Sequence, residues 1–175
     1  NFTMNPSEKD FQLACVLVDH SVKVKAKEHV LIVTDDLGLP LAKAVYSEVM
    51  KRGAFPLIEI ATSGLAYTFY SQANVWQLSY VPDEVIKTKY NWADAFVRIV
   101  ADENLRELAS IDATKLTMRA KLMRPYSDIM LKKRWILTYY PTAAMAQEAG
   151  MSLEEMRRFY FDSCLVDYGV MQKRL

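Results

Sequence analysis

The sequence is poor in the residues that loop-rich or metal-binding proteins need. Its 175 residues include only 5 glycines, which argues against a fold dominated by loops. Histidine and cysteine are limited to His20, His29, Cys15 and Cys164, and none of them has the spacing of a metal site such as H-E-x-x-H. Both cysteines fall within helical patterns, so we expect two buried, reduced thiols and no disulfide.

A marked charge excess and long apolar runs are also missing. The formal net charge is +1, whereas proteins that bind nucleic acid without sequence preference carry a marked basic excess. No apolar run approaches the roughly 20 residues that span a bilayer. No basic and apolar leader precedes the first helical pattern, so nothing points to secretion. We therefore expect a cytoplasmic protein with no nucleic-acid partner and no membrane partner.

Motifs for two common chemistries are absent as well. The turn after the first predicted strand reads T-D-D-L-G-L-P (residues 34–40), with one glycine where a dinucleotide fingerprint needs three. No G-x-S-x-G nucleophile elbow occurs. We expect His20 and His29 at the amino-terminal edge of the sheet, away from the edge where ligands bind. The sequence therefore assigns no catalytic residue and no metal ligand within this chain.

What the sequence does contain is a regular alternation of strand and helix patterns. The apolar run from residue 29 is typical of a strand buried on both faces. We predict a single α/β domain over residues 1–175, with an open, mainly parallel sheet and helices on both faces. Its doubly wound topology would be Rossmann-like or flavodoxin-like, with right-handed crossovers. At least four strands are expected, near residues 29–35, 55–60, 94–101 and 134–140.

The helical patterns have recognisable ends. A helix is predicted from Asn5 to about Val22, with Asn5 as its cap. Pro125 lies inside a long helical pattern, where a kink or break is expected. The other predicted helices cover residues 39–51, a broken pattern over 64–92, residues 103–109, and a segment from 112 onward.

The segment from Tyr140 to Glu155 contains two helix starts. Thr142 is placed to cap a short helix that Gly150 ends, since glycine at a helix C-terminus adopts a positive φ without strain. Ser152 and Glu155 have the S-x-x-E spacing of a capping box, which predicts a second helix.

The same segment resembles a known family. Its string Y-P-T-x-x-x-A-Q-x-A-G-M-S-L-E-E (Tyr140–Glu155) is similar to the end of the N-terminal domain in the M29 family of metal-dependent aminopeptidases. The segments His20–Val33 and Leu39–Ile60 are similar to earlier parts of that domain. All three are scaffold segments, so the resemblance points to a family and carries no catalytic residue onto this sequence.

The resemblance implies that the chain is the N-terminal, non-catalytic domain of a larger enzyme that removes N-terminal amino acids from peptides. In the family, two divalent metal ions of the zinc, cobalt or manganese class are bound by the C-terminal catalytic domain, whose ligands are not in this sequence. This domain would contribute to substrate access and dimer assembly, and would be inactive alone. Its expected partners are the catalytic domain, a second copy and the peptide substrate. The alternative is a self-contained α/β module that binds a small ligand.

Four acids follow predicted strands and define a candidate ligand rim. In an open parallel sheet, ligands bind beyond the carboxyl ends of the strands. Asp35, Asp36, Asp102 and Glu103 stand at two such ends, where their carboxylates suit a cation or an amine. The alternative is that these acids only cap the helices that follow.

A basic segment between Lys115 and Arg134 contains seven bases and only one acid, Asp128. It reads either as a solvated helix face or as a surface that meets an acidic domain or subunit. The expected interdomain or dimer interface comprises Lys121, Arg124, Lys132, Lys133 and Arg134.

Overall fold

The structure is a computed structural model that describes residues 4–172, and the side chains as far as residue 165. Four parallel strands form one sheet in the order β2-β1-β3-β4. This order is that of the first four strands of a flavodoxin-like sheet, so the predicted α/β fold class is confirmed. The strands are β1 (His29–Asp35), β2 (Phe55–Ala61), β3 (Ala95–Val100) and β4 (Arg134–Tyr139).

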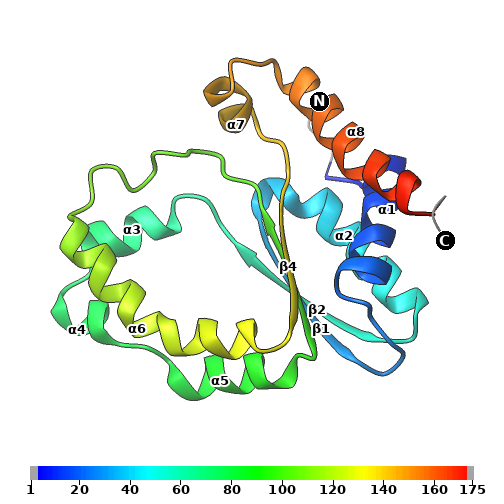
Figure 1. The fold of residues 1–175 in the computed structure, drawn as a ribbon. Helices are drawn as coiled ribbons and strands as arrows, with labels where there is room; N and C mark the ends of the chain where they lie inside the picture. The colour runs from blue at the N-terminus through cyan, green and yellow to red at the C-terminus, as the bar shows by residue number, and fades with distance from the viewer. Residues whose placement is uncertain (1–3, 173–175) are drawn as a thin grey trace.

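Helices surround the sheet and connect its strands (Figure 1). The π-helical turn η1 (Leu17–Ser21) continues the first helix, and the 3₁₀ turn η2 (Asp36–Gly38) follows β1. The α-helices are α1 (Glu8–Val16), α2 (Leu39–Lys51), α3 (Leu65–Gln72), α4 (Val75–Ser79), α5 (Asp83–Trp92), α6 (Ala113–Leu131), α7 (Ala143–Glu148) and α8 (Leu153–Gln172).

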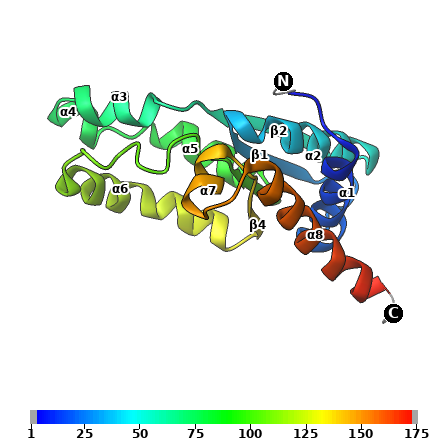
Figure 2. The same ribbon diagram turned by 90° about the horizontal axis from the view of Figure 1, so that it is seen from above.

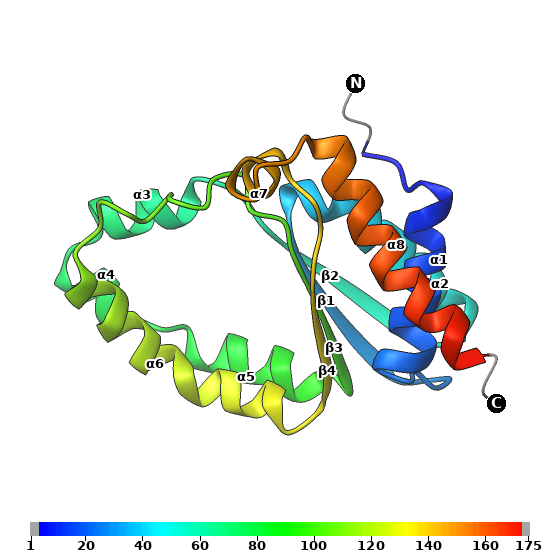
Figure 3. The ribbon, with the colours of Figure 1, turned by 45° about the horizontal axis from the view of Figure 1, so that its top comes forward.

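The two faces of the sheet are covered unequally. The larger core lies on the face that α1, α2 and α8 cover, where Val30, Ile32 and Val97 are fully buried. On the other face, Leu31 and Phe96 pack against residues of α5 and α6 in a much smaller cluster. Figures 2 and 3 show α3 and α4 reaching away from the sheet, with α6 leading back toward it. Part of this second face therefore stays open to solvent.

Close packing at the carboxyl edge requires a glycine. A Cβ atom on Gly38 would come within 2.3 Å of Thr34 Oγ1 and 2.9 Å of Ile99 Cγ2. Thr34 is fully buried at the end of β1. The turn after β1 can therefore approach β3 only because residue 38 has no side chain.

The segment after β4 agrees with its predicted caps. The Thr142 hydroxyl accepts from Met145 N at 3.3 Å, and Gly150 has φ +68°. Ser152 and Glu155 form both hydrogen bonds of the capping box, at 2.8 and 3.2 Å. Local capping chemistry therefore sets the starts of α7 and α8.

Two expectations for helices were wrong, and a third was wrong in part. Residues 103–109 form successive turns, because the Asn104 side chain accepts from Arg106 N at 3.0 Å and competes with a helix. The first helix begins at Glu8, and its cap is Ser7, whose hydroxyl accepts from Asp10 N. At Pro125, where a kink or a break was expected, α6 continues, so the break does not occur.

Pro125 is tolerated because its position is exposed. The carbonyl that loses its helical donor belongs to Lys121, which is exposed too, so water can bond to it. The next residue, Tyr126, is buried and donates to Asp83 Oδ1 at 2.5 Å. This hydrogen bond anchors the second half of α6 to α5.

Cys15 and Cys164 are thiols that form no disulfide, and both are half-buried where burial was predicted. Within residues 4–172, no helix is long and apolar enough to cross a membrane.

Candidate functional site

A pocket of about 270 Å³ lies at the carboxyl ends of β1, β2 and β3. In the order β2-β1-β3-β4, β1 and β3 flank the point where the winding reverses, and open α/β sheets bind ligands at such a point. The pocket brings together three of the four predicted rim acids: Asp35, Asp102 and Glu103.

Asp35 and Arg98 form the floor of this pocket. Arg98 donates to Asp35 Oδ1 at 3.0 Å, and the backbone N–H of Ala101 donates to Asp35 Oδ2 at 2.8 Å. Both charged side chains are largely buried, at 13% and 29% exposed. Asp35 therefore joins the ends of β1 and β3, and both of its oxygens already have a donor.

The other rim acids differ in their roles. Asp36 accepts from the backbone N–H of Ser63 at 3.0 Å, which ties η2 to the loop after β2. Burial raises the pKa of Asp102, and the negative charges of Asp35 and Glu107 act in the same direction, while Arg98 opposes them. Among the pocket acids, Asp102 is therefore the one that a proton or a cationic ligand would stabilise most.

Two pocket residues were not identified from the sequence. Arg98 is the one charged residue within the apolar strand β3. Because a buried charge needs a partner, its position in the sequence could have identified it. Glu107 gave no signal, because residues 103–109 were predicted to be helical. Its carboxylate accepts a short hydrogen bond from the backbone N–H of Gly64, at the start of α3.

The pocket suits a small ligand with positive charge or hydrogen-bond donors. Its side chains include one guanidinium and four carboxylates, those of Asp35, Asp102, Glu103 and Glu107. These carboxylates do not make a metal centre. Among residues 4–172, no group of three or more His, Cys, Asp or Glu side chains is placed to hold a metal ion.

His29 lies at the opposite edge of the sheet, as predicted. It starts β1, where its ring is 4.6 Å from that of Trp92 and its Nδ1 is 3.3 Å from Asp94. His20 lies in η1, which packs near the start of β4. Neither histidine lines the carboxyl-edge pocket.

Four bases of the basic segment bind backbone carbonyls at the ends of helices. Lys115 donates to Tyr70 O at 2.9 Å, near the end of α3. Lys133 donates to Tyr90 O at 2.8 Å and Asn91 O at 2.9 Å, and also to Ala93 O, at the end of α5. These carbonyls lack helical donors, and a cation also complements the negative end of the helix dipole.

Arg119 and Arg134 do the same for two other helix ends. Arg134 donates to Val22 O at 2.9 Å and Lys23 O at 2.7 Å, just beyond η1, and pairs with Glu28. Arg119 donates to Leu78 O at 3.2 Å and Tyr80 O at 2.5 Å at the end of α4.

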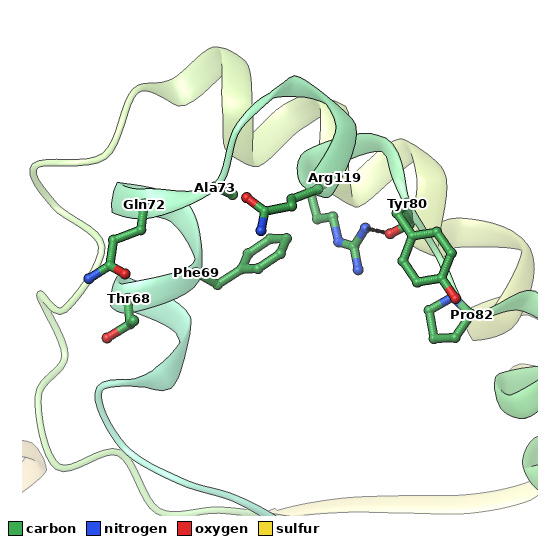
Figure 4. Close-up of a pocket in the computed structure, with 8 residues that line it drawn as sticks. Thr68, Phe69, Gln72, Ala73, Tyr80, Pro82 and Arg119 are labelled. Carbon is green, nitrogen blue, oxygen red and sulfur yellow. Dashed lines mark hydrogen bonds between the residues drawn. The ribbon is translucent and has the colours of Figure 1, made fainter.

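Arg119 also lines a groove of about 410 Å³ between α3, α4 and α6. Figure 4 shows its guanidinium beside Tyr80, with Phe69 on the other side. The guanidinium carbon is 5.1 Å from the centre of the Phe69 ring, within cation–π range. Because this charge already has carbonyl and ring partners, we do not assign a ligand to the groove.

The remaining bases of the expected interface are Lys121, Arg124 and Lys132. All three are exposed, and their side chains form no hydrogen bond or ion pair within the described residues. Lys133 and Arg134, in contrast, form hydrogen bonds with groups of this same domain. A surface that meets another domain would therefore present Lys121, Arg124 and Lys132.

Comparisons with known proteins agree with the resemblance in the sequence. Comparison with curated proteins gave no match. Wild-type AmpT from Thermus thermophilus has a similar structure, with a TM-score of 0.72 over 90% of this chain. The identity is 12%, so the likeness shows the fold alone, and the chain covers 42% of the AmpT chain. The family described as thermophilic metalloprotease (M29) matches residues 7–169. Because this match takes in nearly the whole sequence, the chain belongs to the M29 peptidase family.

Proposed function

We propose that this chain is the N-terminal, non-catalytic domain of a metal-dependent aminopeptidase that removes N-terminal amino acids from peptides. The observation that carries this proposal is the M29 family match over residues 7–169. The fold similarity to AmpT, of which the chain covers 42%, agrees with a domain of a larger protein. In this proposal the domain shapes substrate access and contributes to dimer assembly.

The proposal assigns the chemistry to another part of the enzyme. Two divalent ions of the zinc, cobalt or manganese class would be bound by a C-terminal catalytic domain, where they would polarise the peptide carbonyl and activate water. The partners of this chain would be that catalytic domain, a second copy and the peptide substrate, in the cytoplasm. Its own contribution would be its surfaces, among them the exposed bases Lys121, Arg124 and Lys132.

An activity comparison tests this assignment. The 175-residue chain and the complete product of its gene are purified in parallel and assayed on aminoacyl chromogenic substrates with added zinc, cobalt or manganese. We expect turnover only from the complete product, since a catalytic metal needs three or more protein ligands around an open position. Turnover that follows the 175-residue chain through purification would show that the domain is itself catalytic.

The carboxyl-edge pocket supports a second candidate, a module that binds a small ligand. Its position between β1 and β3 and its excess of carboxylates favour a small amine. Thermal unfolding in the presence of a set of small amines, compared with their neutral hydroxyl analogues, is the direct test. Binding would raise the melting temperature with the amines alone, through mass action. Equal curves for both sets would remove this candidate.

A further inference from the structure

The carboxyl-edge pocket has two walls of different chemistry. Thr62, Ser63 and Ala66, which form the β2 wall, come from the end of β2 and the first turn of α3. Asp102 and Glu107, which form the β3 wall, come from the segment after β3. In the order β2-β1-β3-β4, these two strands flank β1 and are about 10 Å apart, which is two strand spacings. A small molecule in the pocket can therefore contact both walls at once.

The β3 side of the pocket offers one carboxylate without a partner. Asp35 already has donors for both of its oxygens, and Glu107 accepts from the backbone of the opposite wall. Glu103 is exposed, so water screens its charge. Asp102 is half-buried, and its carboxylate accepts no hydrogen bond within the described residues. This side therefore suits one ammonium group, bound at Asp102.

The β2 wall offers hydrogen-bond donors instead. Among the side chains that the structure describes, the hydroxyl groups of Thr62 and Ser63 have no hydrogen-bond partner. Helix α3 begins beside them without a side-chain cap, since its N-cap is Gly64. The first N–H groups of a helix have no acceptor inside it, and they carry the positive end of its dipole. The N–H of Ala66 is one of them, so this wall suits a carboxylate group.

Arg98, on the floor of the pocket, can serve the same anionic group. Two of its N–H donors are used, toward Ile99 O at 3.1 Å and Asp35 Oδ1 at 3.0 Å. The rest of the guanidinium fork remains available, and the side chain is 29% exposed where it lines the pocket. The pocket thus offers one unpaired carboxylate for a cation and one set of donors for an anion.

We propose that this pocket binds a free α-amino acid, with its ammonium group at Asp102 and its carboxylate between the β2 wall and Arg98. The volume of about 270 Å³ lies below the roughly 300–1,000 Å³ of pockets for drug-sized ligands, which limits the occupant to a small molecule. A simple amine would leave the donors of the β2 wall unused, and a simple acid would leave Asp102 unpaired. The inference rests on the second candidate function, a small-ligand pocket, and not on the peptidase role.

Ligands that differ in one group test both halves of the site. The common L-amino acids are added singly, at about 10 mM, to the 175-residue chain, and thermal unfolding is followed. We expect at least one of them to raise the melting temperature. The amide of that amino acid lacks the anionic charge, and its 2-hydroxy acid lacks the ammonium group. Each analogue should therefore bind about tenfold or more weakly.

Two variants assign each ligand group to its side of the pocket. Asp102→Asn should weaken binding of the amino acid and of its amide about tenfold or more, because both carry the ammonium group. The double variant Thr62→Val, Ser63→Ala should weaken binding of the amino acid and of the 2-hydroxy acid, because both carry the carboxylate. Asp128→Asn is the control, since Asp128 is exposed on α6 and does not line the pocket. Circular dichroism checks the fold of each variant.

Each contrary result has its own meaning. If no amino acid changes the melting temperature, the proposal is wrong. If the amide binds as tightly as the amino acid, the pocket recognises an amine alone, so the second candidate function stands and this inference fails. If binding is unchanged in both Asp102→Asn and the double variant, the amino acid binds elsewhere on the chain. Peptidase activity enters none of these comparisons, so a failure of the peptidase role is seen separately.

Discussion

The hydroxyl group of Tyr140 donates a 2.9 Å hydrogen bond to Asp10, 130 residues earlier in the chain, and both residues are buried. Asp10 also accepts from the N–H and hydroxyl groups of Ser7 at 2.7 and 2.8 Å, within the cap of α1. Burial raises the pKa of Tyr140 beyond its usual range, and the charge of Asp10 acts in the same direction. The phenol therefore stays protonated as a donor, and the end of β4 is fastened to the first helix.

Removing this hydroxyl should destabilise the fold. In Tyr140→Phe, the buried Asp10 carboxylate loses one of its donors, which should cost about 1–3 kcal/mol in the free energy of unfolding. Tyr139→Phe is the control, because the Tyr139 side chain is mostly exposed. Loss of its hydroxyl should change the free energy of unfolding by less than about 0.5 kcal/mol. Urea unfolding measures both. Equal stabilities for the two variants would mean that the Asp10 contact contributes nothing.

Neighbouring lysines at the end of α6 should differ sharply in importance. Lys133 bonds to three carbonyls at the end of α5, whereas Lys132 is exposed. Lys133→Met should cost about 1–3 kcal/mol because these carbonyls lose their donor, and Lys132→Met about 0–0.5 kcal/mol. Thermal or urea unfolding of the pair decides this. If Lys132→Met lowered the free energy of unfolding more than Lys133→Met, the stabilising role assigned to the Lys133 hydrogen bonds would be wrong.

The parts of the fold that depend on local sequence were predictable. Apolar runs fixed the four strands, and the Thr142 and Ser152 caps fixed the starts of α7 and α8. Long-range partnerships were not predictable, because nothing near a residue in sequence identifies a distant partner. Glu107 bonds to Gly64 across 43 positions, although its surroundings favoured a helix. The positions of three rim acids were inferred from topology, since parallel strands end at one edge.

The basic segment shows the same limit in another form. Its positive charge was evident from the sequence, but the carbonyls of α3, α4 and α5 that it meets lie about 40 positions earlier. In the sequence, a cluster of bases looks the same whether its side chains face a partner or bind carbonyls at helix ends. Only the packing of α6 against α4 and α5 separates Lys115, Arg119 and Lys133 from the exposed bases.

Glu48 should make stability depend on pH in the acid range. It is buried and accepts from Lys51 at 2.8 Å and Arg52 at 2.5 Å. Burial alone would raise the pKa of Glu48, but these bonds outweigh it and lower the pKa below the usual 4.5. The stabilisation is therefore complete above pH 4.5 and is lost as the pH falls through the lower, folded-state pKa.

The variant Glu48→Gln isolates this contribution. It should be less stable than the original chain by about 1–3 kcal/mol near pH 7, and the difference should shrink below pH 4.5. Glu154→Gln serves as the control, because the Glu154 side chain is 89% exposed and its loss should matter little at any pH. A constant gap between Glu48→Gln and the original chain from pH 7 to pH 3 would contradict the assignment.

Asp102 should behave in the opposite way. Its pKa is raised from 3.8, chiefly by burial, so ionisation above that pH destabilises the folded state. Asp102→Asn removes this penalty and should stabilise the chain by about 0.5–1 kcal/mol at pH 7, with the gain vanishing at about pH 3. The exposed neighbour Glu103, changed to Gln, should have no such effect. A destabilised Asp102→Asn variant at pH 7 would give Asp102 a structural role instead.

The last prediction concerns the exposed bases Lys121, Arg124 and Lys132 in the complete gene product. A catalytic domain that binds two divalent cations must supply many carboxylates, so its surroundings are expected to be negative. Changing the three bases to glutamate should leave the 175-residue chain folded, since exposed charges contribute about 0–1 kcal/mol each. In the complete enzyme, the same change should weaken domain docking or dimerisation, and activity should fall with it.

The control must carry the same change in net charge. Lys25, Lys27 and Lys43 are also exposed and lie away from α6, so their change to glutamate alters the total charge equally. Activity and sedimentation at low and high salt are compared for both triple variants, because salt screens contacts between exposed charges. If only the α6 variant loses activity, and if the two variants differ less at high salt, an acidic partner lies against this surface. Full activity and unchanged sedimentation of that variant at low salt would mean that these bases only face solvent.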